Sequence, residues 1–91
     1  MEMSQPRPED KKISVTIKSR KKTVFDGKAI SISSINDKGP FDILASHANF
    51  ITMVRDYIRV AVDENNFQDI VIKVGVMRVF ENNVQVYLTV V

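Results

Sequence analysis

The sequence predicts an all-β fold, an antiparallel β-sandwich of two sheets, and three observations support this. Runs rich in Val, Ile and Thr alternate apolar and polar residues with the period of two that is typical of strands. Clusters of Gly, Asn and Asp interrupt these runs at short intervals, where tight turns are expected. No stretch keeps a helical period over three turns. Short strands between frequent turns are the pattern of a sandwich or a barrel.

The first half of the chain contains two alternating segments. Ile13 to Lys18 predicts a strand with one solvent-facing side, and Thr23–Phe25 leads into Asp26-Gly27, a dipeptide typical of tight turns. Alternation resumes from Lys28 to Ile35. The following segment, 36–40, is dense in turn formers and is predicted to be a loop.

The middle of the chain is harder to assign. Phe41 to Leu44 predicts a short apolar element, and the apolar residues of segment 50–58 have mixed spacing. That spacing leaves one helical turn and extended chain as open alternatives.

The last third returns to strands. Ile58 to Val62 alternates and ends at a polar turn, 63–66, and a second run extends from Phe67 to Phe80 with a break or bulge at Gly75. After a turn at 81–83, alternation from Val84 to Val90 predicts the final strand.

A sandwich buries the inward side chains of both sheets against each other. Phe25, Phe41 and Phe80 are predicted to close the ends of the sandwich. The predicted core residues are Val15, Ile17, Ile30, Ile32, Ile58, Val60, Ile72, Val86 and Leu88.

Size and composition indicate one ordinary globular domain of 91 residues, with 44% hydrophobic and 26% charged residues. Residues 1–11, with two prolines and no periodicity, are predicted to be a disordered leader, which leaves 12–91 as the domain. Residues 1–28 hold eight basic and four acidic side chains (+4) and residues 29–91 five and seven (−2), which sum to the net charge of +2. This asymmetry predicts a solvated tail, with a basic edge facing an acidic partner or a membrane surface as the alternative.

The sequence predicts no catalytic residue, no cofactor and no metal site. Without cysteine, disulfides, thiolate catalysis and Cys-ligated metals are excluded, and the single His47 would need converging carboxylates to hold zinc. Gly27, Gly39 and Gly75 are too far apart for a phosphate-binding loop, and no Gly-x-Ser-x-Gly motif occurs. A small OB-like barrel that binds nucleic acid, or a protein-interaction module, remains the alternative, although the aromatic residues lie beside turns and not among the Lys/Arg cluster.

One contiguous block is more specific. This block, Phe25 to Val54, contains Phe25-Asp26-Gly27 and then Gly39-Pro40-Phe41-Asp42-Ile43-Leu44-Ala45-Ser46-His47-Ala48-Asn49-Phe50-Ile51-Thr52. A second block downstream contains Val74–Val79 and Asn83-Val84. These segments resemble, in order and spacing, the N-terminal β-sandwich domain of the epsilon subunit of bacterial-type rotary ATP synthases. The resemblance extends over residues 12–90.

The resemblance implies a non-catalytic central-stalk subunit of a proton- or sodium-translocating ATP synthase. Such a subunit couples the gamma subunit mechanically to the c-ring, on the cytoplasmic face of the inner membrane. It needs no cofactor and no nucleic acid, and it contacts the membrane only through the complex. Residue by residue, the resemblance places Lys38, Gly39, Pro40 and Phe41 on a c-ring-facing loop, and Ser46, His47, Ala48 and Asn49 on a gamma-facing loop. For His47, a contact role and a purely local hydrogen-bonding role are both open.

The sequence departs from the family motif at several positions of this block. Pro40 replaces an acidic residue, Asp42 a glycine, Ala45-Ser46 a Pro-Gly pair, and Asn49 a proline. Because residues with side chains rarely adopt positive φ, Asp42 predicts a loop shaped differently from that of the family. The sequence also stops at Val91 with the last predicted strand, so no C-terminal helical hairpin is predicted.

Overall fold

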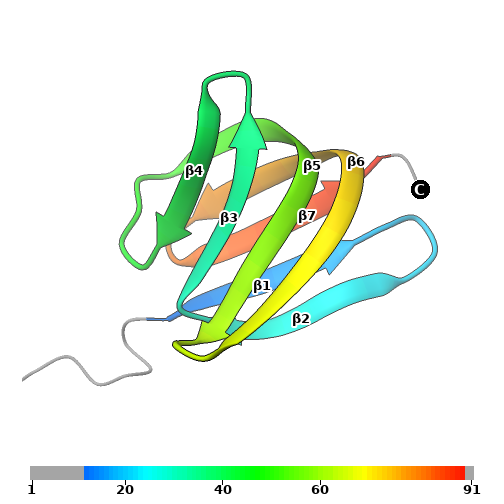
Figure 1. The fold of residues 1–91 in the computed structure, drawn as a ribbon. Helices are drawn as coiled ribbons and strands as arrows, with labels where there is room; N and C mark the ends of the chain where they lie inside the picture. Colours follow the sequence, from blue (N-terminus) through cyan, green and yellow to red (C-terminus); the bar gives the residue numbers. More distant parts are fainter. Residues whose placement is uncertain (1–11, 90–91) are drawn as a thin grey trace, which may run out of the picture.

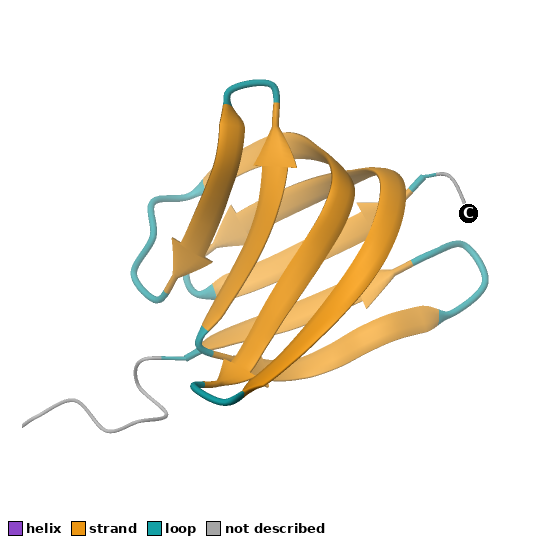
Figure 2. Ribbon diagram, viewed as in Figure 1, coloured by secondary structure: helices purple, strands orange, loops and turns teal. Residues whose placement is uncertain are grey.

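Residues 12–89, described by a computed structural model, form seven strands and no helix (Figures 1 and 2). The prediction of an all-β sandwich is confirmed, whereas the predicted leader, residues 1–11, lies outside the described residues. The strands are β1 (Ile13–Lys18), β2 (Thr23–Ala29), β3 (Ser31–Asn36), β4 (Gly39–Leu44), β5 (Phe50–Asp63), β6 (Asn66–Phe80) and β7 (Asn83–Leu88).

The two predicted sheets are the two layers of one continuous sheet with strand order β2-β1-β7-β6-β5-β3-β4. The long strands β5 and β6 belong to both layers. Segments 50–55 of β5 and 74–79 of β6 form one layer together with β7, β1 and β2. Segments 57–61 of β5 and 67–71 of β6 form the other layer together with β3 and β4. Figure 1 shows β3 and β4 in front of β7, β1 and β2. All pairs are antiparallel except β1 with β7, which is parallel.

The bend between the layers is a β-bulge. Against β6 the register shifts between Arg55 and Tyr57, where Asp56, with φ 72°, lies opposite two residues of β6, 72 and 73. Against β3 it shifts between Ser33 and Ile35, where the extra residues, 56–58, are in β5. Aspartate tolerates this left-handed conformation better than most residues with a side chain, and a bulge bends the strand that contains it.

Gly75 has a different role from the predicted break. It lies in regular register with Val54 and Leu88, downstream of the bulge. A Cβ atom at this position would lie 3.0 Å from the carbonyl oxygen of Tyr87. The glycine therefore permits β7 to approach β6 closely.

The core lies between the two layers, and most of the predicted core residues are buried in it. Leu88 is half-buried and packs against the core from its margin. Ile30 was predicted wrongly, because it occupies the bend between β2 and β3, where Ala29 takes the inward position. The buried apolar residues are Ile13, Val15, Ile17, Ala29, Ile32, Ile43, Val54, Ile58, Val60, Ala61, Ile72, Met77, Val79, Val84 and Val86.

Two further local predictions are wrong. Asp26 and Gly27 lie within β2, paired with β1, and the chain reverses instead at 19–22. Phe25 and Phe41 pack against the core, but Phe80 does not close an end of the sandwich. Its ring is 44% exposed and lies 5.5 Å from the guanidinium carbon of Arg78.

Candidate partner-docking site

The predicted c-ring-facing loop is the tip of the β3–β4 hairpin. Only Asp37 and Lys38 form the turn, while Gly39 to Phe41 are the first residues of β4. The side-chain oxygen of Asn36 accepts the backbone N–H of Lys38 at 2.9 Å, and Gly39 adopts φ 115°. An Asx-type bond followed by a positive-φ glycine fixes a tight turn, so the tip has a defined shape.

The predicted gamma-facing residues lie in the loop between β4 and β5. The backbone N–H of His47 donates to the carbonyl of Leu44 at 3.2 Å, and the His47 Nδ1 atom lies 2.7 Å from the carbonyl oxygen of Ala48. Because a carbonyl oxygen only accepts, Nδ1 is the donor in this contact. The His47 side chain is exposed, and Nε2 has no part in this hydrogen bond. The local hydrogen-bonding role of His47 and a contact through Nε2 are thus compatible.

This loop is tied to the β6–β7 turn, which is distant in sequence. The Ser46 N–H donates to Oδ1 of Asn82 at 2.6 Å, and the Glu81 N–H donates to Oδ1 of Asn49 at 3.0 Å. Glu81 and Asn82 adopt φ 48° and 67°, the conformation of a type I′ hairpin turn. Ser46 and Asn49 therefore hold the loop in place.

Phe50 joins the two predicted groups. Its ring centroid lies 5.1 Å from that of His47 and 6.1 Å from that of Phe41, the latter edge-to-face. Around it is a shallow hollow of about 300 Å³ that brings together five of the eight predicted residues: Lys38, Gly39, Pro40, Phe41 and His47. Asn36 and Phe50 complete its lining, whereas Ser46, Ala48 and Asn49 lie outside it.

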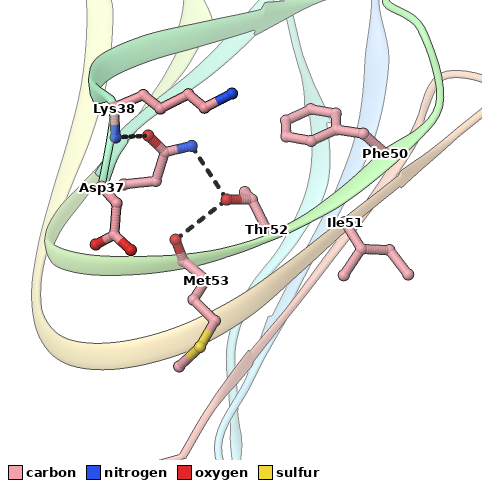
Figure 3. Close-up of a pocket in the computed structure, with 7 residues that line it drawn as sticks. Asp37, Lys38, Phe50, Ile51, Thr52 and Met53 are labelled. Carbon is pink, nitrogen blue, oxygen red and sulfur yellow. Dashed lines mark hydrogen bonds between the residues drawn. The ribbon is translucent and has the colours of Figure 1, made fainter.

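A second hollow, of about 540 Å³, lies between the hairpin tip and β5 (Figure 3). Asn36 crosses it with a 3.0 Å hydrogen bond from Nδ2 to Oγ1 of Thr52. Ile51 and Met53 lie on the other side of the β5 ribbon from Phe50 and are 66% and 63% exposed. Sequence reasoning missed these residues; apolar side chains on both faces of one strand were the available signal.

Charges take little part in the site. The ion pairs found within residues 12–89 join Arg55 to Asp56 and Arg59 to Asp69, each at 2.7 Å. The hydrogen-bonded guanidinium of Arg59 lowers the pKa of Asp69. Neither pair includes Lys38.

In the same part of the chain, no three His, Asp or Glu side chains group together as metal ligands would.

Residues 12–90 match the family described as ATP synthase, Delta/Epsilon chain, beta-sandwich domain. The chain belongs to this family. No curated relative matches the sequence. Among solved structures, the fold resembles a chain of the Euglena gracilis mitochondrial ATP synthase, OSCP/F1/c-ring, with TM-score 0.80, 14% identity and coverage of 99% of this chain and 61% of that one. It also resembles a chain of the Tetrahymena thermophila mitochondrial ATP synthase central stalk/c-ring, with TM-score 0.70, 15% identity and coverage of 85% and 63%.

This chain therefore spans about three-fifths of the length of those two chains. Residues 12–89 contain no helix that is long and apolar enough to cross a membrane.

The departures from the delta/epsilon motif have local explanations. Asp42 is a regular residue of β4 without positive φ, and its Oδ1 accepts a 2.6 Å hydrogen bond from the Ser33 hydroxyl. Asp42 itself therefore needs no positive φ, and the predicted difference from the family's loop shape stays a prediction. The positive φ falls instead on Ser46, at 69°, where the family motif has glycine.

Proposed function

We propose that this chain is a non-catalytic subunit of the central stalk of a rotary ATP synthase, which links the gamma subunit mechanically to the ion-translocating c-ring. The observation that carries the proposal is the convergence of the two motif loops, with His47 and Phe41 in contact with the same Phe50 ring at one end of a β-sandwich of this family. The names of the two similar structures, which include the c-ring and the central stalk, support the same assignment.

Rigidity is what a coupling element needs, because torque passes between two partners only if the body between them does not deform. The β4–β5 loop carries the hydrogen bonds from Ser46 to Asn82 and from Glu81 to Asn49, and the β3–β4 turn carries its own bond at Asn36. These hydrogen bonds restrict the conformations of both loops before binding, so less conformational entropy is lost on association.

In this proposal the hairpin tip, Lys38 to Phe41, faces the c-ring, and the loop from Ser46 to Asn49 faces gamma. The subunit is then held at the cytoplasmic face of the inner membrane through the complex alone. Lys38 is exposed at the tip and belongs to neither ion pair, so it is free to meet an acidic or carbonyl-rich surface of the ring.

Co-expression with the gamma subunit and the c-ring of the same organism tests the proposal. We expect the wild-type chain to co-purify with both. Lys38→Glu should weaken c-ring binding about tenfold, which corresponds to about 1.4 kcal/mol, and His47→Ala should weaken gamma binding. Lys21→Glu, in the exposed turn between β1 and β2 (Figure 1), is the matched charge-reversal control and should bind as wild type. A folded chain that binds neither gamma nor the c-ring would falsify the proposal.

Three phenylalanine side chains argue against the nucleic-acid alternative. Phe25 packs against the core, and the exposed rings of Phe67 and Phe80 each lie under an arginine, Arg59 and Arg78. Stacking of bases would require free aromatic faces beside the basic residues.

A further inference from the structure

The N-terminal part of β5 has a neighbouring strand on one side only. Residues 50–54 pair with 75–79 of β6, and on the other side β3 first pairs at Arg55, opposite Ile35. In an antiparallel strand, alternate residues direct N–H and C=O groups to opposite sides. The segment from Phe50 to Met53 therefore presents backbone groups along an edge that has no neighbouring strand. The Met53 carbonyl accepts a 3.3 Å hydrogen bond from the Thr52 hydroxyl.

The outermost strands of the sheet are protected in ways that this edge is not. In β4, Pro40 lacks an N–H and Asp42 places a charge on the strand, while β2 carries Asp26 and Lys28. Prolines and charges discourage strand addition. Between Phe50 and Val54 there is neither a proline nor a charged residue. The edge is open to another strand.

The exposure of Ile51 and Met53 follows from the same missing neighbour. On one side each has a cross-strand partner in β6, Arg78 and Val76 respectively, and on the other side none. Both side chains are more than 60% exposed. A strand added at the edge would place its own outward side chains against them, as cross-strand pairs do.

The tip of the β3–β4 hairpin faces this free edge across the hollow of about 540 Å³ shown in Figure 3. The 3.0 Å hydrogen bond from Asn36 to Thr52 crosses this gap within segment 50–53, so an added strand would replace it with backbone hydrogen bonds. Asn36, Lys38 and Phe50 line both this hollow and the one beside His47. The edge is therefore continuous with the two motif loops.

We propose that an extended segment of the gamma subunit adds to the sheet as a further strand along Phe50–Met53. This inference rests on the proposed function. Gamma is the partner chosen because the loop from Ser46 to Asn49 leads directly into this edge. The segment needs apolar side chains at alternate positions to cover Ile51 and Met53.

A second free edge, along residues 66–71 of β6, serves as an internal control. It pairs only with β5, and its Val71 is 91% exposed. It belongs to the other layer, its Asp69 is held by Arg59, and neither of the two hollows at the hairpin tip includes any of its residues. The proposal therefore predicts no strand addition there.

Amide hydrogen exchange at single-residue resolution tests the proposal on the free chain and on its complexes with purified gamma and with the c-ring. In the free chain, alternate amides of 50–53 should exchange rapidly. In the gamma complex those amides should slow at least about 100-fold, the mark of new backbone hydrogen bonds, whereas amides of 66–71 should not change.

The outcomes separate the two proposals. A gamma complex that forms without protection of 50–53 overturns this inference alone, as does equal protection of 66–71. Protection of 50–53 by the c-ring and not by gamma overturns the choice of partner. If no complex forms, the proposed function fails and this inference fails with it.

A matched pair of variants tests the same contact through affinity. Ile51→Asp and Val71→Asp each place a carboxylate at an exposed apolar strand position, one on the proposed edge and one on the control edge. Ile51→Asp should weaken gamma binding at least tenfold, and Val71→Asp should stay within twofold of wild type. Equal effects of the two substitutions would overturn the proposal. Circular dichroism of both variants checks that each remains folded.

Discussion

Replacement of Asn82 is the most direct test of how the β4–β5 loop is held against the β6–β7 turn. The side chain of Asn82 accepts the Ser46 N–H at 2.6 Å, and its backbone adopts φ 67° in the β6–β7 turn. The residue thus has two separate roles, as an acceptor and as a residue that tolerates left-handed backbone. Three substitutions separate these roles: Asn82→Ala removes both, Asn82→Gly removes only the acceptor, and Asn82→Asp keeps both.

The expected magnitudes follow from each role. Loss of one hydrogen bond costs about 0.5–1.5 kcal/mol, and a left-handed conformation costs a residue such as alanine about 1–2 kcal/mol. Asn82→Ala should therefore destabilise the fold by about 2 kcal/mol. Asn82→Gly should cost about 1 kcal/mol or less, because glycine adopts φ > 0 freely. Asn82→Asp should be near neutral.

Thermal unfolding measures these differences. In a domain of this size, 1 kcal/mol shifts Tm by about 4–8 °C, so Asn82→Ala should lower Tm by roughly 8–16 °C. Amide exchange at Ser46 should accelerate in the Ala and Gly variants and stay slow in the Asp variant. The reasoning is refuted if Asn82→Gly is as destabilising as Asn82→Ala, or if the Ala variant melts within about 2 °C of wild type.

Three further predictions concern the core, acid stability and loop coupling. Ile43→Ala in the buried face of β4 should cost about 2–5 kcal/mol in urea unfolding, whereas the same change at exposed Ile51 should cost under about 0.5 kcal/mol. The guanidinium of Arg59 lowers the pKa of Asp69 below the ordinary 3.8. The contribution of this ion pair to folding stability is therefore complete above about pH 4–5 and is lost as pH falls. Asp69→Asn should reduce the loss of Tm at low pH in a series of melts at different pH. Asn49→Ala should cost about 1 kcal/mol, and combining it with Asn82→Ala should give less than the sum of the two, since both bonds hold one loop; additivity within about 0.3 kcal/mol would contradict this.

Alternation predicted those strands whose inward and outward faces differ in polarity. β1 matches its predicted position, because Ile13, Val15 and Ile17 all face the core. β7, Asn83–Leu88, matches the predicted strand 84–90 up to Leu88, with Val84 and Val86 buried; Val90 lies outside the described residues. β2 was misjudged. Asp26-Gly27 is a turn dipeptide by local preference, but pairing along the full length of β1 overrides that preference.

The mixed spacing of segment 50–58 has a structural cause. β5 belongs to one layer up to Arg55 and to the other from Tyr57, and the bulge at Asp56 lies between them. Its first part has apolar side chains on both faces, so no clean period of two appears. A bulge between two layers depends on the pairing of distant strands, which local patterns do not contain.

The two blocks of the delta/epsilon motif are far apart in sequence, yet hydrogen bonds join them at one end of the sandwich. The first block supplies Ser46 and Asn49, and the turn directly before Asn83-Val84 in the second supplies Asn82 and Glu81, joined by two reciprocal side-chain-to-backbone bonds. Each bond uses an asparagine as the acceptor for an N–H of the other segment. Where the family motif has proline, Asn49 provides the acceptor for Glu81, so this departure adds a tie between the blocks that a proline side chain cannot make. This end of the sandwich is therefore specified jointly by both blocks, and under the proposed function a substitution in the β6–β7 turn should alter partner binding without contacting the partner.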